Sequence, residues 1–219
     1  MNKIAIIALV IIVMIPLIIA PFTFRDQIQG FLSFLFNNSG DQTSQQDSTS
    51  DLNLVEIQVP RVFNETTCFS FITPNDPSVI ALRDEILQDS IAVLTPDWMK
   101  FRDWVGNKIE YRSDSEIHGE NEYWQFANET IQLETGDCED FSILLCSLLR
   151  SNGWKTDSVY VVVGEHNNQY HAWVKLIWND IQYNVEPQGT GFDVLVGDLT
   201  YLSGYQAICC FNDQEFSIL

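Results

Sequence analysis

The chain has 219 residues, enough for one domain of about 165 residues with its own hydrophobic core after a first stretch of different composition. Its 30 acidic residues outnumber 11 basic ones, and a net charge of -19 repels phosphate backbones, so no nucleic-acid partner is expected. The five cysteines form no CxxC pair and there are only three histidines, which gives a structural zinc site little support.

The N-terminus carries an uncharged apolar run, IAIIALVIIVMIPLIIA, at residues 4–20. We interpret residues 1–36 as an uncleaved membrane anchor with a juxtamembrane segment, although the run is at the short end for a spanning helix. The alternative is a cleaved signal peptide, but the following APFTF contains no clean small-x-small site. Lys3 favours an inside N-terminus, so we expect a single-pass protein of the cell membrane with an extracytoplasmic domain.

A polar segment follows the anchor. Residues 37–51, NNSGDQTSQQDSTSD, have almost nothing to bury and are expected to form a disordered linker. The remaining residues, 52–219, form the expected domain. Its first part, 52–72, has a short strand-like pattern, and helical spacing of apolar residues follows over 78–94 and from 96 to about 106.

After a polar loop at 111–122, the clearest element is a helix from Cys138 to Ser151. Asp137 is the expected N-cap, and Asn152–Gly153 is a typical C-terminal stop. The apolar residues of this helix recur at helical spacing in one wide stripe, which consists of Phe141, Leu144, Leu145, Leu148 and Leu149.

The pattern then changes to strands. We expect them at 158–163, 169–178 and 181–186, with the last two joined by a two-residue turn at Asn179–Asp180. Helices followed by antiparallel strands predict an α+β domain in which N-terminal helices pack on an antiparallel sheet.

Cys138 lies in the first turn of the predicted helix. The unpaired backbone N–H groups and the positive dipole end there favour a thiolate, the nucleophilic form of cysteine. The alternative is a small buried residue, because Cys138 also falls on the apolar stripe.

His171 and Glu186 lie on the predicted hairpin. A two-residue turn places His171 opposite Gln188 and Glu186 opposite Trp173, so His171 and Glu186 become diagonal neighbours on one face. A carboxylate there can orient the imidazole while the other ring nitrogen takes a thiol proton. The alternatives are a structural histidine and a solvated glutamate at the strand end.

These residues carry a family resemblance. GDCEDFSILLCSLLRSNGW, HAWV and the acidic residue of YNVEP, taken in this order, resemble the transglutaminase-like superfamily, a relative of the papain fold, over about Pro77 to Gln188. The resemblance implies that Cys138 is the nucleophile, His171 the general base and acid, and Glu186 the orienting residue. The family more often has aspartate at the third position, so Glu186 must reach the imidazole with a longer side chain.

An acyl-transfer site also needs hydrogen-bond donors for the oxyanion. The backbone N–H of Cys138 is one candidate. The amide of Gln125 and the indole N–H of Trp124 are two others, in a block, YWQFANET, that resembles archaeal and bacterial members of the superfamily. The alternative is that both side chains only pack.

Three carboxylates surround the nucleophile in sequence, namely Asp137, Glu139 and Asp140. This stretch is similar to the motif of calcium-dependent periplasmic cysteine proteinases, and calcium prefers oxygen ligands. The alternative needs no metal, because Asp137 can cap the helix while the other two complement its dipole. No cofactor is required by the proposed chemistry.

The sequence as a whole favours a membrane-anchored thiol enzyme that acts on amide bonds of a protein or peptide substrate. Hydrolysis, as in a peptidase or amidase, is favoured over acyl transfer to an amine. The alternatives are a catalytically inactive transglutaminase-like module used for binding or scaffolding, and a purely structural disulfide domain.

Overall fold

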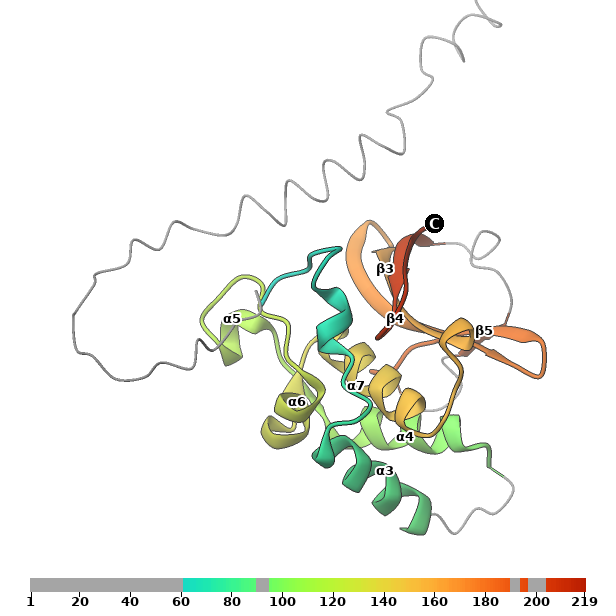
Figure 1. The fold of residues 1–219 in the computed structure, drawn as a ribbon. Coiled ribbons are helices and arrows are strands. Elements are labelled where there is room, and N and C mark those ends of the chain that lie inside the picture. Colours follow the sequence, from blue (N-terminus) through green and yellow to red (C-terminus); the bar gives the residue numbers. More distant parts are fainter. Residues whose placement is uncertain (1–60, 90–94, 190–193, 197–203) are drawn as a thin grey trace, which may run out of the picture. The chain divides into compact units, whose positions relative to one another are not determined.

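The computed structural model describes residues 61–89, 95–189, 194–196 and 204–219 (Figure 1). The predicted anchor and linker, and the start of the predicted domain, lie outside the described residues. Among the helices that are described, none combines the length and the apolar character that crossing a bilayer requires.

The helical segments come first along the chain, followed by most of the strands. The helical segments are η1 (Cys68–Phe71), α3 (Pro77–Asp89), α4 (Asp97–Lys108), α5 (Asp114–Ile117), α6 (Ala127–Leu133), α7 (Cys138–Ser151) and η2 (Thr156–Ser158). The strands are β1 (Glu110–Tyr111), β2 (Thr135–Gly136), β3 (Val159–His166), β4 (Gln169–Trp178), β5 (Ile181–Val185), β6 (Val194–Val196), β7 (Tyr205–Phe211) and β8 (Phe216–Ile218).

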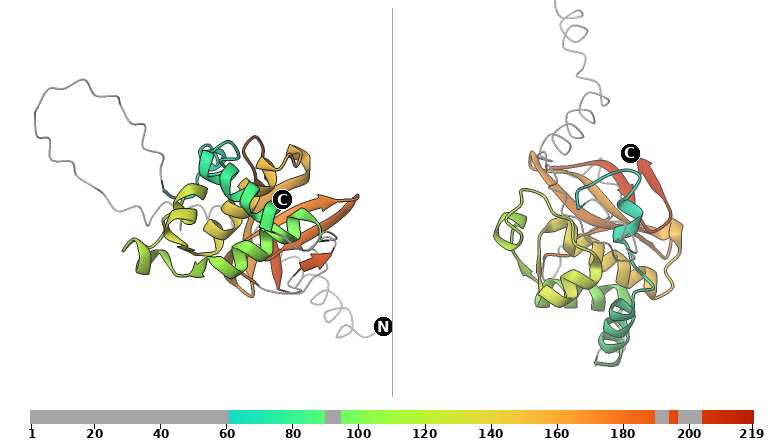
Figure 2. Two further views of the ribbon diagram at one scale, coloured as in Figure 1. Left: turned by 90° about the horizontal axis from the view of Figure 1, so that it is seen from below. Right: turned by 60° about the vertical axis from the view of Figure 1, so that its left-hand side comes forward.

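Six strands form one antiparallel sheet in the order β6-β5-β4-β3-β7-β8, whereas β1 and β2 form a separate parallel pair. Helix α7 lies at the centre of the domain, because it packs on β3 and β4 and also contacts α3, α4 and α6 (Figure 1). The two views in Figure 2 show these helices gathered on one side of β3 and β4. The domain is therefore α+β, as the sequence predicted.

The apolar stripe explains why α7 is the central helix. Residues 139–149 are all buried, including the apolar residues expected to face the core. The helix begins at Cys138 and ends at Ser151, with Asp137 as N-cap, so its predicted bounds are confirmed.

The hairpin of β4 and β5 also follows the prediction. Trp178 pairs with Ile181 and Val174 with Val185, which is the register of a two-residue turn. Both turn residues have positive φ, 52° at Asn179 and 61° at Asp180, as a type I′ turn requires. The register matters because it decides which side chains share a face with His171.

The N-terminal part of the described domain differs from the prediction. The strand-like pattern expected at 52–72 is wrong for its described part, which contains turns and η1. Phe63 and Phe71 are buried there and both pack against Trp124, so their apolar character reflects core packing rather than a β-ladder. The expected polar loop at 111–122 contains the short helix α5.

The C-terminal strands were not predicted. Strand β7 pairs with β3 and β8 pairs with β7, which places the chain's last residues inside the main sheet. This pairing brings Tyr205, the first residue of β7, beside His166 at the end of β3.

Candidate active site

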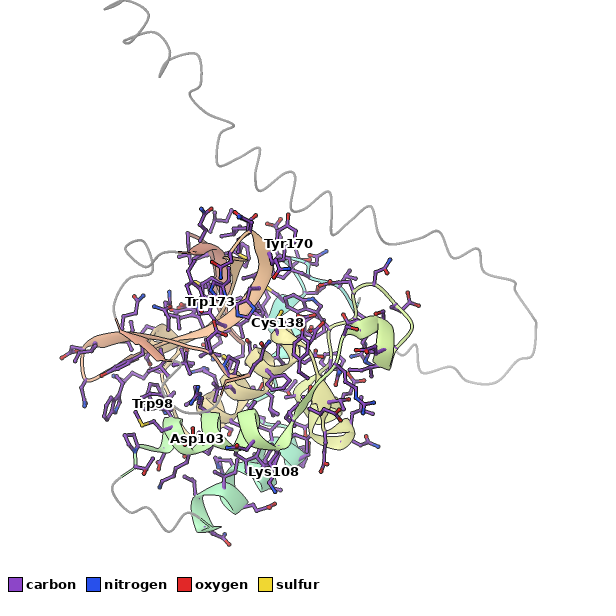
Figure 3. All side chains as sticks on the ribbon, turned by 180° about the vertical axis from the view of Figure 1, so that it is seen from behind. Trp98, Asp103, Lys108, Cys138, Tyr170 and Trp173 are labelled. Carbon is purple, nitrogen blue, oxygen red and sulfur yellow. The ribbon has the colours of Figure 1, made fainter. Side chains whose placement is uncertain are left out.

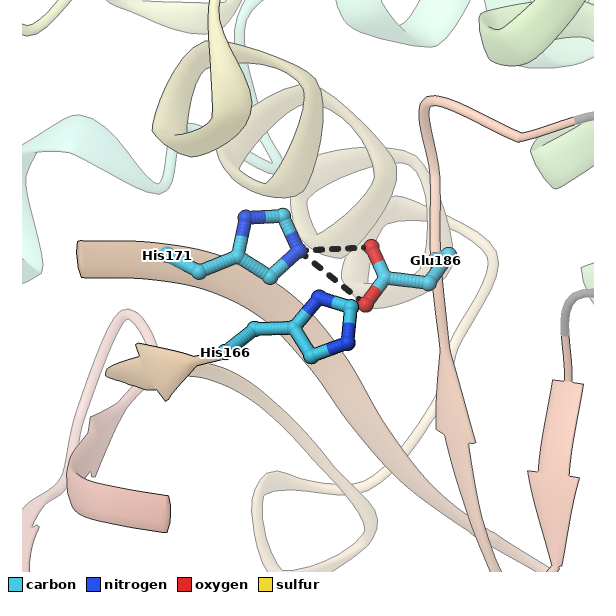
Figure 4. Close-up of side chains that lie close together, drawn as sticks. All are labelled: His166, His171 and Glu186. Atoms are coloured by element: carbon cyan, nitrogen blue, oxygen red, sulfur yellow. Dashed lines mark hydrogen bonds and ion pairs between the residues drawn. The ribbon is translucent and has the colours of Figure 1, made fainter. Parts of the chain in front are cut away.

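His171 and Glu186 are held together on the β4–β5 hairpin. The His171 Nε2 atom lies 3.0 and 2.8 Å from the two carboxylate oxygens of Glu186 (Figure 4). The side chains are only 14% and 16% exposed, so the pair is shielded from bulk water but reachable. The hairpin register thus produces the diagonal contact that the sequence predicted.

Two further contacts hold Glu186 in place. The hydroxyl of Tyr205 donates a hydrogen bond to Oε1 at 2.8 Å, and the buried Arg102 donates from Nε to the Glu186 backbone oxygen at 3.1 Å. These contacts fix both the backbone and the carboxylate of Glu186. The side chain, one methylene longer than that of aspartate, is thereby held in contact with the imidazole.

Cys138 starts α7 next to β4. Its sulfur lies within hydrogen-bonding reach of the Ala172 backbone, and Ala172 directly follows His171. Figure 3 shows Cys138 beside the strand that carries Tyr170 and Trp173. The structure therefore brings the predicted nucleophile, base and orienting residue to one region around β4.

The protonation state of Cys138 differs from the expectation. Burial, followed by the nearby Asp137 carboxyl, raises the pKa of the thiol to about 12, and Sγ donates a hydrogen bond to Glu139 Oε2 at 3.2 Å. A helix N-terminus stabilises an anion by about 0.3–1 kcal/mol, which desolvation and neighbouring negative charge outweigh here. In this state Cys138 is a thiol, not the expected thiolate.

An acidic cluster surrounds the N-terminus of α7. Its five members are Asp114, Glu122, Asp137, Glu139 and Asp140, and their carboxylate oxygens fall into two overlapping groups with separations below 4.8 Å. Desolvation is the largest cause of a raised pKa at all five, and it brings the pKa of Asp114 to about 7. Burying this many carboxyls without a cation is unfavourable.

The free oxygens of the cluster indicate a fit for a hard cation. Asp114 Oδ1, Asp137 Oδ1 and Glu139 Oε1 are buried and accept no hydrogen bond from an N–H or hydroxyl group of the described residues, while the Asp137 and Glu139 carboxyls contact each other. Calcium takes six to eight oxygen ligands and commonly uses carboxylates. The donor set of the acidic cluster therefore fits calcium, and Asp114 and Glu122 add to the residues that the sequence suggested.

Asp140 has a different role from the one in the predicted calcium set. Its Oδ1 accepts a hydrogen bond from the Gln125 backbone N–H at 2.8 Å, and its Oδ2 accepts one from the Asp137 N–H at 3.2 Å. Both oxygens are thus engaged by the backbone. A Cβ on Gly136 would lie 2.6 Å from the Asp140 Cβ, so this close contact requires glycine.

The two side chains considered as oxyanion donors are engaged elsewhere. The Trp124 indole N–H donates to Glu122 Oε1 at 2.8 Å, and the Gln125 amide donates to the Thr135 backbone oxygen at 3.2 Å. Both residues are buried. Their role in stabilising an oxyanion stays a prediction, and in this state packing describes them better.

Several residues near the site were missed at the level of sequence. Asp114 and Glu122 lie in a segment without periodicity, and Tyr205 lies in a strand that was not predicted. His166 also belongs here, because its ring stacks on Tyr205 with centroids 4.0 Å apart and lies 5.7 Å from the His171 ring. The pairing of β3 with β4 and β7 brings His166, His171 and Tyr205 together.

The match to a family model agrees with this fold. Residues 93–186 match the family model of the transglutaminase-like superfamily. Three solved structures of Legionella pneumophila LapG are similar. The first shares 19% identity over 64% of this chain and 76% of that chain, with a TM-score of 0.48. An EGTA-treated form shares 17% identity over 65% of this chain and 74% of that chain, with a TM-score of 0.49. A calcium-bound form shares 17% identity over 64% of this chain and 76% of that chain, with a TM-score of 0.48.

No curated protein sequence matches the chain. The family match spans α4 through α7 and the hairpin of β4 and β5, so it includes Cys138, His171 and Glu186. Residues 93–186 therefore match the transglutaminase-like superfamily, and the domain has a transglutaminase-like fold.

Proposed function

We propose that the domain is a thiol enzyme acting on amide bonds, with Cys138 as nucleophile, His171 as general base and acid, and Glu186 as orienting residue. The observation that carries this proposal is the His171–Glu186 pair, with its Nε2–oxygen distance of 2.8 Å, beside the sulfur at the start of α7. A nucleophile, a base and a group that orients the base are the parts of a catalytic triad.

The geometry suggests the roles of the two ring nitrogens. His171 Nε2 faces Glu186, so Nδ1 is the nitrogen that takes the Cys138 proton. The thiolate then attacks the amide carbonyl, and the Cys138 backbone N–H stabilises the oxyanion. His171 returns the proton to the leaving amine, and water releases the acyl group from sulfur. Hydrolysis is favoured over transfer to an amine because water is always available.

The acidic cluster supports a calcium-dependent form of this chemistry. Asp114, Glu122 and Glu139 would hold the cation, because each offers a carboxylate oxygen within 4.8 Å of the other two, and Asp137 belongs to the second group that shares Asp114. Calcium bound there would supply positive charge next to the sulfur and so favour the thiolate. Glu139 Oε2 accepts the hydrogen bond of the Cys138 thiol, so the same carboxylate that would hold the cation is next to the proton that His171 takes.

One observation favours the rival function of an inactive binding module. Burial raises the pKa of Cys138 to about 12 and its proton is held by Glu139, so the site as described is a poor nucleophile. A disulfide domain has less support, since all five cysteines lie among the described residues and each is a free thiol.

The proposed enzyme acts on the extracytoplasmic side of the cell membrane on a protein or peptide, tethered by its N-terminal apolar run. The support is the apolar composition of residues 4–20 and the position of Lys3. Protease added to intact cells should digest the domain of the full-length protein. Digestion only after the membrane is permeabilised would contradict this orientation.

The proposed chemistry is tested by alkylation of the full-length protein in detergent. With calcium present, iodoacetamide should label Cys138 faster than the buried Cys146, and the difference should vanish in His171→Ala. EGTA should slow Cys138 labelling to the rate of an ordinary buried thiol. Equal rates for both cysteines with calcium present, unchanged in His171→Ala, would favour the binding module.

A further inference from the structure

Two histidines and a carboxylate converge at the open edge of the candidate site. His166, His171 and Glu186 each offer a ligand atom, and these three atoms lie within 4.8 Å of one another (Figure 4). The residues come from the end of β3, the start of β4 and the residue after β5, so the sheet itself sets their spacing. All three are partly exposed and can be reached from solvent.

We propose that His166, His171 and Glu186 form a binding site for a transition-metal ion of the zinc type, and that metal bound there blocks His171. Two imidazoles and one carboxylate are a set that zinc uses, with a fourth position left open. Calcium does not select imidazole, so this site differs in chemistry from the acidic cluster. The binding itself does not depend on the proposed enzymatic function, whereas the blocking of catalysis does.

The distances already approach those of a coordination sphere. Tetrahedral ligands about 2.0–2.1 Å from zinc lie about 3.3 Å from each other. The His171 Nε2 atom is 3.0 and 2.8 Å from the Glu186 oxygens, so a zinc ion replaces the shared proton after a separation of a few tenths of an ångström. The remaining ligand, His166, needs a small movement at the end of a strand.

Neighbouring side chains orient two of the three ligands, as is usual around bound metals. Tyr205 donates a hydrogen bond to Glu186 Oε1 at 2.8 Å and stacks on the His166 ring. Asn167 contacts His166 Nε2 at 3.0 Å, which leaves Nδ1 of that ring for a metal. Tyr205 is thus a positioning residue for the metal site.

Metal in this position would disable the proposed triad without touching the sulfur. Coordination takes the His171 nitrogen that faces Glu186 and separates the base from its orienting carboxylate. Nucleophilic attack then lacks a correctly oriented proton acceptor. His166 has no part in the proposed reaction, so its removal should weaken metal binding while leaving the reaction intact.

The test uses cobalt(II) as a spectroscopic probe for zinc, added to the full-length protein in detergent with calcium present. We expect one equivalent to bind with the visible absorption of a four-coordinate ion and no thiolate-to-cobalt charge-transfer band. Zinc should displace it. Affinity should fall at least about tenfold in His166→Gln and by about 10- to 100-fold in Tyr205→Phe, the range expected for loss of an outer-shell contact.

Cys138→Ser and Asp97→Asn serve as controls and should bind cobalt normally. Zinc should also stop Cys138 alkylation in the unchanged protein but not in His166→Gln. Absence of bound cobalt, binding that His166→Gln leaves unchanged, or a thiolate band lost in Cys138→Ser would each overturn the site. These outcomes are independent of turnover, so failure of the metal site is distinguishable from failure of the proposed enzyme.

Discussion

Two groups of ionisable side chains flank Cys138, and the structure treats them in opposite ways. On the side of the sheet, His171 and Glu186 pair directly and Tyr205 completes the hydrogen bonds of the carboxylate. At the N-terminus of α7, the acidic cluster contains buried oxygens that accept no hydrogen bond from an N–H or hydroxyl group of the described residues. The His171–Glu186 pair has its hydrogen bonds satisfied by protein atoms alone, whereas the acidic cluster lacks a positive charge among its described neighbours.

The difference separates the two requirements of a thiol enzyme. The base and its orienting residue are preformed by the hairpin register. The proposed nucleophile, in contrast, is kept protonated by burial and by its acidic neighbours. In the proposed enzyme, activation therefore depends on charge at the acidic cluster rather than on movement of the hairpin.

The largest expected effect comes from disrupting the His171–Glu186 pair. Glu186→Gln should lower the rate of the calcium-supported reaction by about 10³- to 10⁴-fold, because the amide stabilises the wrong imidazole tautomer and cannot balance an imidazolium charge. Peptide-amide turnover measures this effect, and Glu186→Asp, which restores the family's more common residue, should recover part of the rate. Equal rates for Glu186→Gln and the unchanged protein would remove Glu186 from the proposed triad.

The second-largest effect comes from adding calcium to the acidic cluster. Calcium at one hundred times its dissociation constant should stabilise the folded domain by about 2.7 kcal/mol, which shifts the melting temperature by several degrees. Calorimetry with calcium and with EGTA measures it. The shift should disappear in the double variant Asp137→Asn, Glu139→Gln and persist in Asp97→Asn, an exposed residue outside the cluster.

The tight packing that supports the acidic cluster predicts a smaller effect. Gly136→Ala should destabilise the domain by about 1–3 kcal/mol, because the new methyl group would lie 2.6 Å from the Asp140 Cβ. Urea unfolding measures the change, with Asn128→Ala on an exposed position of α6 as control. An effect no larger than that of the control would show that the Asp140 contacts adjust freely.

The smallest expected effect is a dependence of folding stability on pH that is caused in part by Asp114. The folded-state pKa of Asp114 is about 7, above its ordinary value, so the folded protein binds more protons than the unfolded chain between these values. In EGTA, stability should therefore fall as pH rises from about 4 to about 7, by about 1 kcal/mol or more. Asp114→Asn should reduce this dependence, and the other four carboxyls of the acidic cluster, whose pKa values are also raised, should maintain the remainder. Stability that rises with pH over the same range would contradict a buried Asp114 without a cationic partner among the described residues.

Local patterns were sufficient for the central helix and the hairpin. The stripe from Phe141 to Leu149 required a helix with one strongly buried side, and the Asn179–Asp180 turn set a register that made His171 and Glu186 neighbours. These elements depend on contacts close in sequence, which is why their bounds match the structure to within one residue.

Contacts between segments distant in the chain could not be predicted from the sequence. Phe63 and Phe71 looked strand-like because apolar residues recur there, yet they fill the core beside Trp124. Asp114 meets Asp137 through α5, an element of four residues with no periodic signal. Long-range packing decided both cases, and short-range spacing carries no information about it.

The sequence by itself determined that a cysteine starts a buried helix and that a histidine and a glutamate share one face of a hairpin, since both follow from periodicity and turn length. The tertiary structure decided the protonation state of that cysteine. Chain folding gathers carboxyls from separate segments around it and removes them from water, and desolvation of this kind exists only once the segments are packed.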